Sequence, residues 1–273
     1  MVSLSTRRWL SITLATTLGA ALLFANSVLS IALLDPSMYS GWTLLGMMFA
    51  LALFNTRKKL LPLPLGTSAM WLQLHIYLGF LSVVVFVLHT GWRLPSGQLE
   101  TVLFALYVFV AGTGLVGLAL SRLIPIRLAR HEQEIIFERI PIFRKQLSEE
   151  AREIALKSIE GGSTIIADFY HEQLVRFFSD PRNVFAHFVG AHRVRHTIIP
   201  ELRALRRYLT EADIEKLTRL EDIVLTKNGL DFQYANQAAL KVWLFLHIPP
   251  TYALLIFSVL HVVVVYAYSG AFS

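Results

Sequence analysis

Long apolar segments alternate with short polar ones along most of the chain, and one long polar region interrupts the pattern. Five segments are apolar over about 20 residues, the length that an α-helix needs to cross the hydrocarbon core of a bilayer. The predicted spans are Trp9–Leu34, Ser37–Asn55, Ser68–Trp92, Thr101–Ser121 and Val242–Tyr268. We therefore expect an all-α integral membrane protein with a bundle of five transmembrane helices.

The first span has a second interpretation. Arg7 and Arg8 precede an apolar core, and small residues follow near Phe24–Ser27, as in a cleaved signal peptide. The apolar core is long for a signal peptide, which favours an uncleaved helix. Either interpretation leaves the orientation of the remaining spans unchanged.

The polar region, residues 125–238, carries signals of helices. Asp180-Pro181 and Thr210–Asp213 are typical helix starts. Gly161-Gly162 and Asn228-Gly229 are expected to interrupt the helices, and alternating strand patterns are scarce. We expect a mostly helical cytoplasmic insert. The predicted domains are residues 1–124 with transmembrane helices one to four, residues 125–238 as the insert, and residues 239–273 with helix five.

The charges predict the orientation. The insert holds as many basic as acidic residues, so the net charge of +6 comes from the membrane ends. Seven of the eight bases at these ends fall on one side of the predicted topology, a pattern typical of cytoplasmic loops rather than of nucleic-acid binding. We expect a bacterial inner-membrane protein with a cytoplasmic N-terminus and insert. The eight bases are Arg7, Arg8, Arg57, Lys58, Lys59, Arg93, Arg122 and Lys241.

The chain contains no cysteine. This excludes disulfides, cysteine-ligated iron–sulfur clusters and haem attached through C-x-x-C-H. A nucleotide-binding glycine pattern is missing too, and the insert lacks the full H-E-x-x-H metalloprotease pattern. Any haem must therefore be held non-covalently by histidine or methionine.

Four histidines form two equally spaced pairs inside the most apolar spans. His75 and His89 lie in the third span, and His247 and His261 lie in the fifth, each pair 14 residues apart. Such a separation corresponds to a rise of about 21 Å and a rotation that ends about 40° from the start. Each helix thus presents two imidazoles on nearly one face. Ionisable residues in such segments are functional by default.

The topology predicts how the histidines pair. One reversing span separates the third span from the insert that leads to the fifth, so the third and fifth helices run parallel. His75 then shares a depth with His247 near the cytoplasm, and His89 shares a depth with His261 near the outside. We expect two stacked bis-histidine sites for two haems b.

Basic residues near the two sites are candidate partners of haem propionates. Arg93 is the one base predicted on the external side, and Arg122 and Lys241 are candidates at the inner site. Small residues, which permit close approach of either a macrocycle or another helix, lie one turn after His75 and in a cluster on the fourth span. These are Gly79, Gly112, Gly114 and Gly117.

The segments LHIYLGFLSVVVFVLHTGW and LHIPPTYALLIFSVLHVVVVYAY resemble the di-haem membrane cytochromes b, a group that includes quinol-oxidising cytochrome b subunits and ferric reductase-like transmembrane proteins. The resemblance covers the histidine-bearing helices and implies the four histidines as axial ligands. It implies the cytochrome b subunit of a membrane redox complex, with a quinone or redox proteins as partners beside the lipid bilayer. The large insert departs from the family pattern.

Two other classes of protein are compatible with intramembrane histidines. A membrane metal transporter would use them to bind a translocated cation, and a non-haem helical scaffold would use them for packing. A visible spectrum of the purified chain separates these classes.

Overall fold

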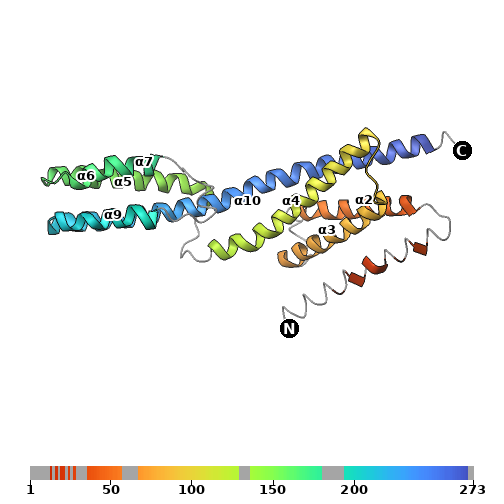
Figure 1. Ribbon diagram of the computed structural model, residues 1–273, viewed down its shortest axis with the longest axis horizontal. Coiled ribbons are helices and arrows are strands. Elements are labelled where there is room, and N and C mark those ends of the chain that lie inside the picture. Colours follow the sequence, from red (N-terminus) through yellow and green to blue (C-terminus); the bar gives the residue numbers. More distant parts are fainter. Residues whose placement is uncertain are drawn as a thin grey trace. The chain divides into compact units, whose positions relative to one another are not determined.

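The computed structural model describes residues 36–56, 67–128, 136–179 and 194–269, together with scattered positions between residues 13 and 28. Secondary structure in these ranges is helical, without a strand. The long helices are α2 (Pro36–Thr56), α3 (Ser68–Thr90), α4 (Gln98–Leu128), α5 (Ile140–Glu160) and α10 (Glu211–Ser269) (Figure 1). Short helices are α6 (Ile165–Phe169), α7 (Val175–Ser179) and α9 (Ile199–Ala204).

The chain divides into two compact units. Unit 1 comprises Met1–Ala119 and Trp243–Ser273, and unit 2 comprises Leu120–Val242. Within unit 1, α2 and α3 pack side by side. Within unit 2, the helices α5 to α7 lie beside α9 and the first part of α10 (Figure 1). Each unit has its own cluster of buried apolar side chains.

Four helices among the described residues are long and apolar enough to span a membrane: Pro36–Phe54, Ser68–Thr90, Gln98–Leu128 and Glu211–Tyr268. They correspond to the second to fifth predicted spans and indicate a multi-pass membrane protein. Most of the predicted first span, Trp9–Leu34, lies outside the described residues.

The start and end of α3 follow from local chemistry. At the start, the Thr67 hydroxyl accepts a hydrogen bond from the Met70 amide. At the end, Gly91 adopts a left-handed conformation with φ +58°, which stops the helix at Thr90, slightly before the predicted end. Trp92 also has a positive φ of 59° and is almost fully exposed. A short segment without helix follows Gly91, and α4 begins at Gln98.

Helix α10 begins at Glu211, as the Thr210–Asp213 pattern predicts, and runs without interruption to Ser269. The prediction that Asn228-Gly229 interrupts the helix is therefore wrong. A glycine costs a helix about 1 kcal/mol relative to alanine. The neighbouring Val224 and Leu230 are buried, and their packing outweighs that cost.

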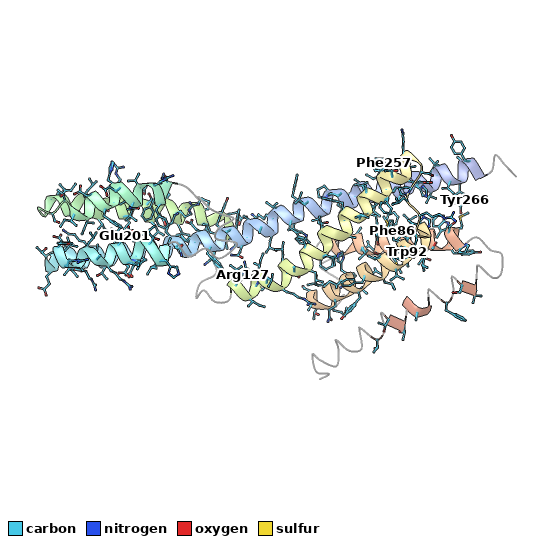
Figure 2. The ribbon with its side chains drawn as sticks, viewed as in Figure 1. Phe86, Trp92, Arg127, Glu201, Phe257 and Tyr266 are labelled. Carbon is cyan, nitrogen blue, oxygen red and sulfur yellow. The ribbon has the colours of Figure 1, made fainter. Side chains whose placement is uncertain are left out.

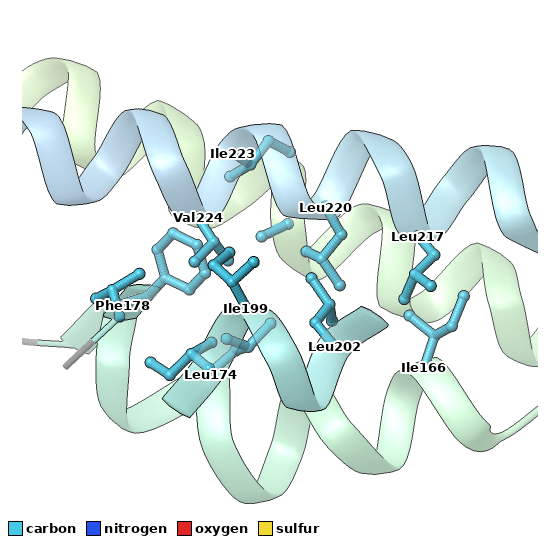
Figure 3. Packing of buried hydrophobic residues seen from close by; sticks show 12 residues of the cluster. Ile166, Leu174, Phe178, Ile199, Leu202, Leu217, Leu220, Ile223 and Val224 are labelled. Carbon is cyan, nitrogen blue, oxygen red and sulfur yellow. The ribbon is translucent and has the colours of Figure 1, made fainter. Parts of the chain in front are cut away.

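The core of unit 2 is apolar. Figure 3 shows Leu217, Leu220 and Val224 of α10 directed toward the shorter helices. Their spacing places them on one face of α10. The side chains that they meet include Ile199 and Leu202. This face fixes the register of α10 against the rest of unit 2.

A buried ion cluster lies beside that core. Lys227 is 2% exposed, and its ammonium group donates hydrogen bonds to the Asp231 carboxylate at 2.5 Å and to the Phe177 carbonyl at 2.7 Å. Arg144 of α5 contacts the second carboxylate oxygen of Asp231 at 3.1 Å. One buried carboxylate therefore neutralises cations from two helices.

Asp213→Asn is expected to remove part of the acid sensitivity of unit 2. The pKa of the Asp213 carboxyl lies below its ordinary value, chiefly because Lys216 donates a hydrogen bond to it and also because Thr210 does. Stability from a carboxyl whose folded pKa is lowered is present above the unfolded pKa and is lost as pH falls through the folded value. The difference in unfolding temperature between the natural chain and the variant should thus shrink below about pH 4.

Circular dichroism melts of the full chain at pH 7 and at about pH 3 measure this difference. Asp222→Asn, which alters an exposed carboxyl on the same helix, is the matched control. An equal pH dependence in both variants would contradict the assignment to Asp213.

Candidate functional site

The structure brings the four membrane histidines together in two pairs. The rings of His89 on α3 and His261 on α10 lie 6.5 Å apart, centre to centre, and are nearly perpendicular at 87°. His75 lies close enough to His247 for the charges of their imidazoles to interact. Helices α3 and α10 are therefore parallel, the arrangement that the topology predicts.

A cavity of about 470 Å³ opens between α2, α3, α4 and α10 at the level of His89 and His261. Both imidazoles line it, and so does Arg93, the predicted propionate partner. Cofactor sites commonly have volumes of about 300–1,000 Å³ and apolar walls with a few polar groups. The wall is largely aromatic and aliphatic. Two of the side chains that line it, Phe86 and Tyr266, are labelled in Figure 2.

The imidazole of His89 is oriented by the start of α2. Its Nδ1 lies 3.0 Å from the Ser37 carbonyl oxygen, and because a carbonyl only accepts, Nδ1 carries the proton. This leaves the Nε2 lone pair available to a metal. A Cβ added to Gly41 would lie 2.9 Å from His89 Cε1, so this contact requires glycine.

The imidazole of His247 meets α4. Its Nδ1 lies 2.9 Å from the Thr113 hydroxyl oxygen. The Trp243 indole, one turn earlier on α10, stacks on the His247 ring at 5.5 Å and 18°. Gly114 faces the same imidazole, with 3.7 Å between a built Cβ and His247 Cε1.

His75 lacks such a partner at one ring atom. Its Nδ1 is buried and has no hydrogen-bond partner in the structure. The Phe54 ring lies 5.0 Å from the imidazole. A Cβ built on Gly79, one turn further along α3, would meet no atom within 4 Å. A buried nitrogen without a partner is costly unless a ligand satisfies it.

These residues fit a haem held by two histidines. Two imidazole nitrogens that bind one metal ion from opposite sides, at about 2 Å each, place their ring centres roughly 6 Å apart, and His89 and His261 show 6.5 Å. In the described part of the chain, no group of three or more histidine, cysteine or acidic side chains gathers around a common point.

Two of the predicted propionate partners belong to unit 2. The Lys241 ammonium donates a hydrogen bond to the Glu138 carboxylate at 2.7 Å and lies 3.9 Å from the centre of the Phe137 ring. Arg122 is exposed on the C-terminal part of α4. Of the three predicted bases, Arg93 is the one that the structure places in the wall of a histidine cavity.

Sequence reasoning missed three positions that the structure places against the histidines. Trp243 precedes His247 by one helical turn, and that spacing alone was an available signal. Thr113 lies among the small residues of α4, whereas Gly41 carries no signal in its neighbourhood. No protein-family model, curated protein or solved structure matches the chain.

Proposed function

We propose that this protein transfers electrons across a membrane through two b-type haems, as the cytochrome b subunit of a redox complex. His75 and His247 would hold one haem, and His89 and His261 the other. The observation that carries the proposal is the His89–His261 pair, which faces one cavity together with Arg93.

A haem b with two histidine ligands supplies a one-electron couple without an open coordination position. The chain's own residues hold and orient it. The Ser37 carbonyl fixes the proton of His89 on Nδ1, and Gly41 gives that ring room. Arg93 offers a cation for a propionate at the cavity wall.

The proposed setting is the inner membrane of a bacterium, with the N-terminus and the insert in the cytoplasm. The charge distribution supports this orientation, and the exposed apolar faces of the four candidate spans suit lipid. The proposed redox partners are a membrane quinone and proteins on the cytoplasmic or external side.

The purified chain is expected to be red and to contain two low-spin haems b. A pyridine haemochrome assay measures the haem-to-protein ratio, and a reduced-minus-oxidised spectrum shows the low-spin bands. His171→Ala, at an exposed position of unit 2, should leave both unchanged. A ratio near zero would remove the proposal and favour a metal transporter or a helical scaffold.

A further inference from the structure

We propose that Thr113 is a positioning residue for His247, and that Trp243 seated on Gly117 holds α4 and α10 at the distance this requires. The inference rests on the proposed function, because it concerns how His247 presents a ring nitrogen to a haem. All four residues belong to unit 1. None of the predicted site residues performs this role.

The hydroxyl of Thr113 determines which nitrogen of His247 carries the proton. Its oxygen lies 2.9 Å from the Val110 carbonyl, to which it donates, and 2.9 Å from His247 Nδ1. A hydroxyl has one proton, so with that proton on the Val110 carbonyl the oxygen must accept from Nδ1–H. Nε2 then keeps its lone pair, the state that a metal ligand needs.

Trp243 fixes the distance over which this hydrogen bond forms. Its indole nitrogen donates to the Thr113 carbonyl at 2.7 Å, so both polar groups of the same α4 residue contact α10. The indole ring also lies against Gly117, and a Cβ built on Gly117 would overlap the ring atoms. The indole ring also stacks on the His247 ring. The side chain thus links the α4 backbone to the imidazole.

The second hydrogen bond of a metal-bound histidine raises the basicity of the ring and fixes its orientation. Loss of such a partner commonly weakens metal binding by about 10- to 100-fold. A less basic His247 also stabilises the oxidised metal less, so the potential of that haem should rise. The haem at His89 and His261 should keep its properties, because the Ser37 carbonyl orients His89 instead.

The test compares Thr113→Val, which keeps the shape and removes the hydroxyl, with Thr113→Ser, which keeps the hydroxyl. Thr101→Val is the matched control on the same helix, because the Thr101 hydroxyl bonds only the local Gly97 carbonyl at 2.8 Å. Two readouts are used. Nitrogen-15 NMR of histidine-labelled protein freed of haem reports the tautomer of His247. Transfer of haem to apomyoglobin and redox titration, both on the haem-loaded protein, report retention and potential.

In Thr113→Val we expect one haem component to leave about 10-fold faster or more and to titrate at a higher potential, while the second stays unchanged. Thr113→Ser should restore both values, and Trp243→Phe should give a smaller change of the same sign. Without haem, the natural chain should show Nδ1–H at His247, and Thr113→Val should lose that preference.

Two outcomes separate this inference from the proposed function. If the natural chain holds two haems and Thr113→Val alters neither component nor the tautomer, the role of Thr113 is wrong while the proposed function stands. If the natural chain holds no haem, the proposed function fails, and the NMR spectrum of the haem-free protein still decides whether Thr113 sets the tautomer. An equal effect of Thr101→Val would also overturn the role of Thr113.

Discussion

His89→Ala and His261→Ala are each expected to abolish the same haem component, and His75→Ala and His247→Ala the other. Removal of one histidine of a pair would take away one of the two protein groups that would hold that haem and would leave the other imidazole unpaired in a medium of low polarity, which should prevent stable binding. Each single variant should therefore lose one haem of two. Redox titration followed by visible and electron paramagnetic resonance spectroscopy identifies which component remains.

Which two variants lose the same haem distinguishes parallel from antiparallel helices. The 6.5 Å contact of His89 with His261 requires that these two variants match each other. A match of His89→Ala with His247→Ala would require antiparallel helices and would contradict both the structure and the predicted topology. A double variant of one pair, His89→Ala with His261→Ala, should lose no more haem than either single variant.

Asp231→Ala is expected to lower the free energy of unfolding of unit 2 by about 3–5 kcal/mol. The substitution leaves the Lys227 ammonium and the Arg144 guanidinium buried without the carboxylate that neutralises them. Desolvated charges of one sign then repel each other at close range. Hydrogen exchange of the full chain, resolved by mass spectrometry, should show faster exchange in α5 and in the first part of α10.

Glu153→Ala is the matched control. Glu153 also pairs with a lysine four residues away on its own helix, at 2.8 Å from Lys157, but both side chains are more than half exposed. Exposed pairs of this kind contribute little to stability, because water screens the attraction between the two charges. Exchange rates that change equally little in Asp231→Ala would show that the buried cluster does not hold unit 2 together.

Hydropathy was sufficient to predict α2, α3, most of α4 and the last part of α10. The spans from Ser37 to Asn55 and from Ser68 to Trp92 lie within two residues of α2 and α3 at each end. The beginning of α10 was predicted from the capping pattern at Thr210. The predicted interruption at Asn228-Gly229 was wrong. It followed from the low helix propensity of these two residues, whereas the burial of neighbouring side chains decides the conformation at this point.

In the candidate site, the pairing of the histidines was predictable from the sequence, whereas the contacts around them were not. The spacing of the histidines and the count of crossings predict which rings meet, because both are properties of the chain order. The contacts of Thr113 and Trp243 depend on the rotation of α4 about its axis and on side-chain rotamers, and a hydrophobic pattern determines neither to the required accuracy. Gly41 shows the same limit, since its importance follows from one ring placed against it.

Helix α10 follows α2 to α9 in the chain and is therefore synthesised after them. The ribosome releases His75 and His89 long before His247 and His261, and all of unit 2 is synthesised in between. Domains generally fold as units while synthesis proceeds from the N-terminus. Until the last helix enters the bilayer, His75 and His89 of α3 would lack their partner histidines. Forming each pair would close a loop that comprises well over half of the chain. Cofactor insertion would then be a late, post-translational step, and a nascent chain arrested within unit 2 would remain colourless.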